Sequence, residues 1–357
     1  MSSNIWLLIT IALFVVLVVV IVKKIRPIWR KLLSILVILL LFFFSAFNFA
    51  VPMNPPLPAS GPFGVRNEKA FYQHETKYPD MATEGQVREI PVSLWLPDVS
   101  DGVYPLIIFS HGSFGVADSN MSLFDELASH GYIVASLDHP YHSFTTTLSD
   151  GKSINIDIDF MQNVMRSQGA EDLEVLMEDF NKWKSIRVED ISFVMDSLLS
   201  DAKYKDRINS KQIILSGHSL GGTAALELGR TRSNELIGVV SLEAPFFGDI
   251  VGIDGDEFVF IDDEYPLPVL HFYSDALWGR MNEITTYEMN QRLIDAKSDK
   301  YVNVHIEGSG HIGLSELSLV SPILTNALDQ GMNTTPVYEK IAKINEATLQ
   351  FLEVITN

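Results

Sequence analysis

The chain has 357 residues and no cysteine, and its 45 acidic and 26 basic residues give a net charge of −19. The missing cysteines exclude disulfides, thiol catalysis and cysteine-based zinc sites, and the acidic balance argues against nucleic acid as a partner. No two histidines have the spacing of a zinc-protease helix, so we expect neither a metal nor another cofactor.

The first 51 residues predict a transmembrane helical hairpin. Residues 5–22 carry no charge and residues 32–51 carry three polar side chains, so each stretch is long and apolar enough to span a bilayer. Five basic residues lie within residues 23–31, which the positive-inside rule places in the cytoplasm. A cleaved signal peptide is the alternative for the first span, but residues 1–4 lack a basic residue and a second span follows. We therefore expect a multi-pass protein of the cell membrane with an extracytoplasmic C-terminal domain.

The remainder is predicted to form a linker and one large domain. Residues 52–85 are assigned to the linker and the approach to the domain, because residues 52–62 are rich in proline. Residues 86–357 are long enough for a single core. Strands are predicted at 87–96, 106–109, 133–137, 212–215, 236–242, 268–273 and 301–306, and helices at 121–130, 171–199, 223–229, 282–296 and 337–355. This alternation predicts an α/β fold, a mostly parallel sheet with helices on both faces.

Seven acidic residues gather within residues 249–264, around the apolar sequence FVFI. Their spacing is not that of an EF-hand loop. We interpret the segment as a solvated hairpin between two core strands rather than as a calcium site.

The sequence GHSLGG at residues 217–222 follows a short apolar strand and precedes a helix rich in small residues. A G-x-S-x-G in this setting predicts a nucleophile elbow, a strained turn that exposes the hydroxyl of Ser219. Gly217 and Gly221 are needed because a Cβ there would collide with the neighbouring strand or helix. The alternative is a glycine-rich turn in which the serine only caps the helix.

A second motif, SHGSFG at residues 110–115, follows the apolar strand LIIF. In α/β hydrolases a loop of this type supplies one backbone amide of the oxyanion hole, and the residue after the nucleophile supplies the other. We therefore predict the N–H groups of Ser113 and Leu220 as the oxyanion pair. The alternative is a glycine turn that only connects a strand to a helix.

The general base is predicted at His311, which lies in the glycine-rich loop GSGHIG after the last strand. This is where an α/β hydrolase places its histidine. His111, Phe114 and His218 lie beside the predicted oxyanion loop and nucleophile, and we expect them to line the substrate site.

Two carboxylates compete for the role of triad acid. Glu243 follows the strand at 236–242, and Asp275 follows the strand at 268–273. Most α/β hydrolases carry the acid after the later strand, which favours Asp275, whereas some carry it one strand earlier, which favours Glu243. Either residue could also be an ordinary carboxylate at a strand end.

The segments FSHGSFG, LASHGYIVASLDHP, ILSGHSLGGTAAL, GVVSLEAPFFGD and GSGHIGLSEL, in this order, resemble the platelet-activating-factor acetylhydrolase family. The resemblance covers residues 87–352. It implies an α/β-hydrolase fold, a Ser-Asp-His triad without a metal, and hydrolysis of esters that include short or oxidised acyl chains of phospholipids. The family's nucleophile falls on Ser219 and its base on His311. Its aspartate falls on Glu243, which departs from the family pattern and keeps Asp275 as a competitor.

Together these features predict a membrane-anchored serine carboxylic ester hydrolase that acts through an acyl-enzyme on an ester or lipid substrate. A peptidase or acyltransferase with the same triad, or a catalytically silent extracellular domain, is the alternative.

Overall fold

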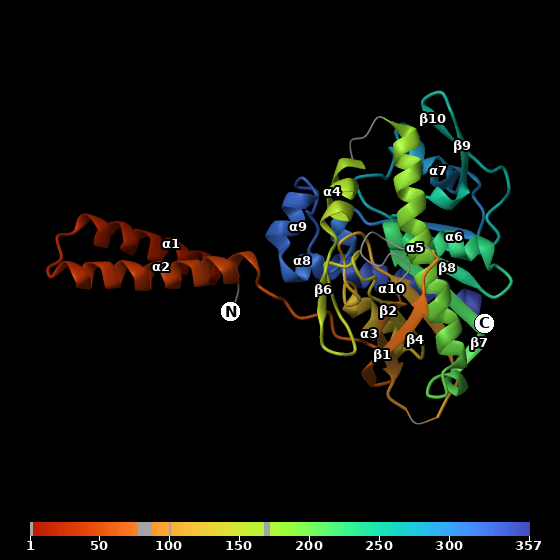
Figure 1. Cartoon of the computed structure of the whole chain (residues 1–357), viewed down its shortest axis with the longest axis horizontal. Coiled ribbons are helices and arrows are strands. Elements are labelled where there is room, and N and C mark those ends of the chain that lie inside the picture. The colour runs from red at the N-terminus through yellow and green to blue at the C-terminus, as the bar shows by residue number, and fades with distance from the viewer. Residues whose placement is uncertain (1–2, 78–86, 100, 168–171) are drawn as a thin grey trace.

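The computed structural model describes residues 3–77, 87–99, 101–167 and 172–357. Two long N-terminal helices form a hairpin that projects away from an α/β domain, and the domain begins with the strand β1 (Figure 1). The helices of the hairpin are α1 (Ser3–Val22) and α2 (Ile28–Ala50). Those of the domain are α3 (Met121–Ser129), α4 (Ile158–Ser167), α5 (Leu173–Ser200), α6 (Leu220–Thr231), α7 (Glu288–Asp295), α8 (Leu317–Val320), α9 (Pro322–Leu328) and α10 (Val337–Thr356).

Eight strands form one mixed sheet in the order β1-β2-β4-β3-β7-β8-β11-β12. They are β1 (Val65–Glu75), β2 (Val87–Pro97), β3 (Tyr104–Ser110), β4 (Ile133–Leu137), β7 (Ile208–His218), β8 (Gly238–Leu242), β11 (Val269–Tyr273) and β12 (Tyr301–His305). The six strands from β4 to β12 run parallel, whereas β2 is antiparallel to both β1 and β4. The predicted, mostly parallel sheet is thereby confirmed.

Apolar side chains cover the sheet on both faces because successive residues of a buried strand point to opposite sides. On β3, Ile108 packs into a core that includes residues of α5 and α6, while its neighbours Ile107 and Phe109 face the opposite core. The second core is closed by α3 and α10. This two-sided burial fixes the carboxyl ends of the parallel strands, where the predicted site residues lie.

The strand β1 lies within the segment that the sequence analysis assigns to a linker. Its residues alternate between half-buried and exposed, as expected for the edge of a sheet. The proline-rich linker before it is fastened to the domain rather than being a free spacer. The N–H of Asn54 donates to the carbonyl oxygen of Leu319 at 2.8 Å, and the N–H of Ser60 donates to the Glu126 carboxylate at 2.7 Å. Residues 78–85 of the predicted linker lie outside the described residues.

The predicted helix at 282–296 is too long. The α-helix α7 begins only at Glu288 and ends at Asp295, and two short 3₁₀ turns, Met281–Glu283 and Thr285–Tyr287, precede it. The sequence Ile284-Thr285-Thr286 explains the late start, because β-branched side chains lose rotamer freedom in a helix.

The predicted acidic hairpin is present as β9 (Ile250–Asp254) and β10 (Glu257–Phe260), which pair in antiparallel fashion between β8 and β11. One acidic residue of the cluster is not solvated. Asp249 is buried and accepts two hydrogen bonds from Arg230, at 2.7 and 2.8 Å. The segment between β4 and α5 also contains a small hairpin, β5 (Thr145–Thr147) with β6 (Ser153–Asn155), and α4, none of which the sequence pattern predicted.

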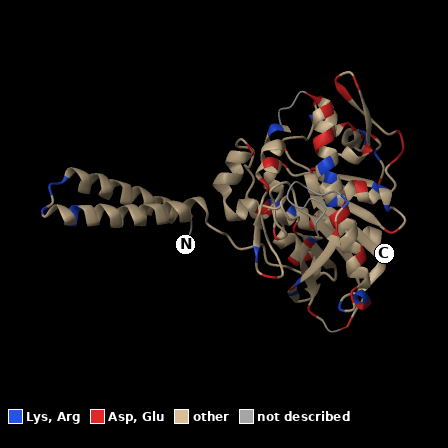
Figure 2. Ribbon diagram, in the orientation of Figure 1, with Lys and Arg blue, Asp and Glu red and all other residues tan. Residues whose placement is uncertain are grey.

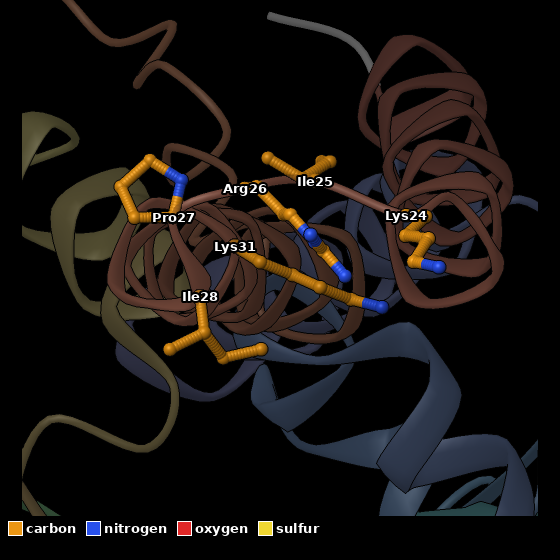
Figure 3. Close-up of a pocket in the computed structure, with 6 residues that line it drawn as sticks. All are labelled: Lys24, Ile25, Arg26, Pro27, Ile28 and Lys31. Carbon is orange, nitrogen blue, oxygen red and sulfur yellow. The ribbon is translucent and has the colours of Figure 1, made fainter.

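The helices α1 and α2 pack side by side and are long and apolar enough to cross a membrane. Trp6 packs edge-on against Phe44, and the hydroxyl of Thr10 donates to that of Ser45 at 2.9 Å. The hairpin's Lys and Arg residues lie at its turn, far from the domain (Figure 2). There Lys24, Arg26 and Lys31 line a hollow of about 680 Å³ (Figure 3). The hollow lies at the far end of the hairpin, away from the carboxyl ends of the strands, so it is not part of the candidate active site (Figure 1).

Candidate active site

Ser219 occupies a sharp turn between β7, which ends at His218, and α6, which begins at Leu220. Its backbone has φ 51° and ψ −124°, a conformation that is strained for a residue with a side chain. The flanking glycines permit this turn. A Cβ on Gly217 would lie 2.5 Å from the carbonyl carbon of Gly221, and a Cβ on Gly221 would lie 2.0 Å from the carbonyl oxygen of Ser110. The elbow is therefore clamped between its own helix and the end of β3.

Three side chains from separate elements meet at this turn. The Oγ of Ser219 lies 2.9 Å from Nε2 of His311, and Nδ1 of the same ring lies 2.8 Å from Oε1 of Glu243. Because a carboxylate only accepts hydrogen bonds, Nδ1 of His311 carries the ring proton, and Nε2 is free to accept the proton of the Ser219 hydroxyl. The imidazole is thus held in the tautomer that a general base requires.

Glu243 lies one residue after β8 and is buried, with 1% of its surface exposed. Its carboxylate accepts hydrogen bonds from both the N–H and the hydroxyl of Ser274, the latter at 2.9 Å. These bonds tie the carboxyl end of β8 to that of β11. They also satisfy the lone pairs that do not face His311, which lowers the cost of burying the charge.

Asp275, the competing acid, is placed elsewhere. Its Oδ1 lies 2.7 Å from Nε2 of His305, and its Oδ2 accepts the N–H of Gly308 at 3.0 Å. Its side chain is partly exposed, at 36%. The structure therefore brings Glu243 against His311 and gives Asp275 a different histidine.

The loop that carries His311 is held by a carboxylate that the sequence analysis did not identify. Asp329 accepts the N–H groups of Ile312 and Gly313 at 2.9 and 2.8 Å. Burial opposes the charged imidazolium, but the hydrogen bond and charge of Glu243, with the charge of Asp329, raise the pKa of His311 above its ordinary value. Loss of the Glu243 charge would remove most of this support.

The predicted oxyanion loop forms a tight turn above the elbow. The N–H of Gly115 donates to the carbonyl oxygen of Gly112 at 3.1 Å, and Phe114 takes a positive φ of 66°. A Cβ on Gly112 would lie 3.4 Å from the Cβ of Ser219, so the loop passes directly beside the elbow. Ser113 lies at the second position of this turn, and Leu220 is the first residue of α6.

His111 and His218, expected to line the substrate site, are both buried and bonded within the protein. Nδ1 of His111 donates to the carbonyl oxygen of Gly112 at 2.7 Å, and Nε2 accepts from the hydroxyl of Ser143 at 2.7 Å. Nε2 of His218 lies 3.1 Å from the carbonyl oxygen of His311. Burial lowers the pKa of His218 to about 3. Neither ring nitrogen of His111 remains for a substrate, which makes this histidine a support for the loop.

Phe114, the third residue expected to contact substrate, is half-buried at the edge of an apolar cluster beside the elbow. Its ring lies 5.9 Å from that of Phe160, which in turn lies 5.6 Å from Trp183. Leu220 belongs to the same cluster. An apolar wall from α4 and α5 therefore flanks the predicted oxyanion pair.

A buried polar network lies under the loop and was not foreseen. Asp190 of α5 accepts from Nδ1 of His139 at 2.8 Å and from Nε of Arg88 at 2.9 Å. Nε2 of His139 accepts the hydroxyl of Ser110 at 2.8 Å. Burial, which outweighs the nearby carboxylate, lowers the pKa of His139 to about 4 and keeps the ring neutral. The sequence offered only one signal for this network, charged residues on the otherwise apolar face of a predicted helix.

Among the residues that the structure describes, no group of three or more His, Cys, Asp or Glu side chains could hold a metal ion.

Comparison with known proteins places this chain in a family. A family model described as "Platelet-activating factor acetylhydrolase, isoform II" matches residues 89–356. The chain belongs to this family. The resemblance found in the sequence is thereby confirmed.

Curated relatives are similar over a shorter stretch. The platelet-activating factor acetylhydrolase of Canis lupus familiaris is 28% identical over 141 residues, which cover 35% of this chain and 31% of the relative. The protein of the same name from Bos taurus is 27% identical over 139 residues, with the same shares. The match thus spans about a third of the length of these curated relatives.

Solved structures share the fold. A ferulic acid esterase from Streptomyces cinnamoneus has a TM-score of 0.64 at 16% identity, covering 84% of this chain and 92% of its own. The dienelactone hydrolase-like promiscuous phosphotriesterase P91 from metagenomic libraries has a TM-score of 0.51 at 15% identity, covering 82% of this chain and 99% of its own. These likenesses show that the domain has the α/β-hydrolase fold.

Proposed function

We propose that the protein is a serine carboxylic ester hydrolase in which Ser219, His311 and Glu243 form the catalytic triad. One observation carries the proposal, the continuous chain of hydrogen bonds from Ser219 Oγ through both ring nitrogens of His311 to the buried Glu243 carboxylate. Membership of a family named for an acetylhydrolase supports it.

The reaction follows from these groups. Ser219 Oγ attacks the ester carbonyl while His311 Nε2 accepts its proton, and Glu243 stabilises the imidazolium that forms. The N–H groups of Ser113 and Leu220 bind the oxyanion of the tetrahedral intermediate. The intermediate collapses, His311 protonates the departing alcohol, and an acyl-enzyme remains on Ser219. Water, deprotonated by His311, then releases the acid and regenerates the serine.

The substrate class is proposed from the walls of the site. The half-buried Phe114 lies beside Ser113 and against the buried cluster of Phe160, Trp183 and Leu220, so it presents an apolar surface next to the proposed oxyanion donors. Such a surface favours an apolar acyl group over a charged one. We therefore assign short-chain or phospholipid-type esters as substrates, in agreement with the family's name.

The nucleophile is tested by Ser219→Ala. Loss of the serine should lower turnover of a p-nitrophenyl ester by about 10⁶-fold and abolish covalent labelling by a fluorophosphonate, with an unchanged melting temperature. Labelling at another serine would refute the assignment of the nucleophile. A wild-type chain that neither labels nor turns over any ester would indicate a silent domain, and hydrolysis of peptides alone would indicate a peptidase.

We further propose that α1 and α2 anchor the protein in the cell membrane, with the turn that holds Lys24, Arg26 and Lys31 in the cytoplasm and the hydrolase domain outside. The apolar length of both helices and the basic turn between them support this orientation. Protease added to intact cells should reach the domain and cut the chain on the C-terminal side of α2. A domain that is cut only after cell lysis would contradict the orientation.

A further inference from the structure

Arg187 is a fully buried cation beneath the proposed oxyanion loop. It lies in the middle of α5, and none of its surface is exposed. Burying a guanidinium is costly unless strong partners compensate. Within the described part of the chain, its hydrogen bonds go only to two backbone carbonyl oxygens, from Nη1 to His111 and from Nη2 to Gly112, the latter at 3.4 Å, while Nε has no partner. The charge of the buried Asp190 carboxylate offers partial compensation, but the hydrogen bonds of Arg187 are directed at the loop.

The two carbonyl groups determine where the loop's N–H groups point. A trans peptide directs its C=O and its N–H to opposite sides. The only cis peptide among the described residues joins Arg26 and Pro27, so the Gly112–Ser113 peptide is trans. A donor that holds the Gly112 oxygen on one side therefore turns the Ser113 N–H to the other.

Three donors converge on the Gly112 oxygen. Besides Arg187, they are Nδ1 of His111 at 2.7 Å and the N–H of Gly115 at 3.1 Å. His111 is held in the required tautomer because its Nε2 accepts from Ser143. Of the three donors, only Arg187 carries a charge. Hydrogen-bonded groups in a low-dielectric site polarise one another, so a cation on the oxygen makes the N–H of the same peptide a stronger donor.

We propose that Arg187 is a positioning residue for ester hydrolysis, which orients and polarises the Gly112–Ser113 peptide so that the Ser113 N–H is held ready for the oxyanion. This role rests on the proposed function and adds to it a charged group that never touches the substrate. It acts on the transition state, because the negative charge on the carbonyl oxygen is absent from the bound ester and develops as the tetrahedral intermediate forms.

Arg187→Met and Arg187→Lys test the role. Removal of one oxyanion donor costs about 10²–10³ in kcat in related chemistry, so we expect Arg187→Met to lower kcat on a soluble p-nitrophenyl ester by about 10²-fold, with KM within about twofold. Arg187→Lys keeps the charge and should recover part of the rate. The number of folded sites is counted by fluorophosphonate titration, so that a loss of folded protein is not mistaken for a loss of rate.

Lys184→Met provides the matched control. Lys184 is a buried cation one turn earlier on α5, at 7% exposure, and it pairs with Glu227 instead of the loop. Its loss should lower the melting temperature by a similar amount and leave kcat per folded site within about twofold. If Arg187→Met lowers kcat no more than Lys184→Met does, Arg187 is only structural and the proposal is overturned.

A trifluoromethyl ketone, which forms a tetrahedral oxyanion on the serine, separates positioning from general damage. Its Ki should rise in Arg187→Met by the same factor by which kcat/KM falls, because both depend on oxyanion binding. An unchanged Ki would contradict the role.

A double-mutant cycle with Ser113→Pro completes the test. Ser113 occupies the second position of a turn, where proline is tolerated, and proline removes the N–H. If Arg187 acts through this N–H, adding Arg187→Lys to Ser113→Pro should cost less than a further twofold in kcat. Additive losses would overturn the role of Arg187 while leaving the proposed hydrolase intact. Near-full activity in Ser113→Pro would remove the oxyanion assignment itself, and with it this role of Arg187.

Discussion

The choice between the two acids can be tested by Glu243→Gln and Asp275→Asn. The Glu243 carboxylate accepts from Nδ1 of His311 and from two donors of Ser274. A glutamine has one accepting oxygen, so its NH₂ group must face one of these donors.

Both orientations of the amide are harmful. If the NH₂ group faces His311, the ring must take the other tautomer, and Nε2 can no longer accept the proton of Ser219. If it faces the N–H of Ser274, two buried donors oppose each other, which costs about 1–3 kcal/mol of folding stability. In either case the imidazolium loses its anionic partner. A comparable substitution of the triad acid in a serine protease lowers kcat by about 10⁴-fold, equivalent to about 5.5 kcal/mol of transition-state stabilisation.

Asp275→Asn is the matched control. Its carboxylate is partly exposed and bonded to His305 and Gly308, so we expect turnover within about twofold and a loss of at most about 1 kcal/mol of stability. The assay is turnover of a short-chain p-nitrophenyl ester per fluorophosphonate-titrated site, with thermal melting as the folding control. Near-full turnover in Glu243→Gln together with a crippled Asp275→Asn would refute the reasoning and assign the acid to the later strand.

Three further outcomes are expected. The pKa of His311 is raised and the general base must be neutral, so the acidic limb of the kcat/KM profile should have a pKa above about 6.5. In Glu243→Gln this acidic limb should move to lower pH. An acidic limb with a pKa at or below about 6.5 in the wild type would contradict the prediction. Burial, against hydrogen bonds from Ser122, raises the pKa of Glu316 from 4.5 to about 7. The folded state therefore keeps a proton that the unfolded chain releases, so Glu316 alone contributes a loss of up to about 3 kcal/mol of stability as pH rises through this window. Because buried histidines and Asp138 titrate in the same range, the contribution is measured as the difference in urea stability between the wild type and Glu316→Gln. A difference that does not change with pH would exclude Glu316. Gly221→Ala would place a Cβ 2.0 Å from the carbonyl oxygen of Ser110. We therefore expect it to lower the free energy of unfolding by more than about 1 kcal/mol and to abolish fluorophosphonate labelling at Ser219. A normal melting temperature and a normal labelling rate would disprove this expectation.

The sequence was most informative where the fold imposes a local signature. The elbow at Ser219 and the loop at His311 could be placed because each needs glycines at fixed positions beside an apolar strand. The parallel sheet followed from strands that are apolar on both faces, such as β3. In these cases the chemistry that determines the structure lies within a few neighbouring residues.

Other features depended on contacts between distant segments. Glu243 and Asp275 both follow strands, and only the side chain of Ser274 and the position of His311 distinguish them in space. Arg187 lies 75 residues from Gly112 in the sequence, and no local pattern connects the two. The strand β1 was missed because an edge strand exposes half of its side chains and carries charged residues that mask its alternation.

The position of Glu243, the proposed acid, directly after β8 affects how this protein could diversify. The stretch from Ala276 to Tyr287, after β11, supplies no member of the proposed triad, although Trp278 there stacks on His305 with ring centres 5.1 Å apart. In a hydrolase whose acid follows the later strand, an insertion in this stretch would displace a catalytic group. Here the proposed acid is anchored by Ser274 before that stretch begins. The exposed residues 278–280 are therefore a place where evolution, or a protein engineer, can lengthen or exchange the chain without displacing a member of the proposed triad, provided that the buried Leu277 and Met281 on either side stay in place.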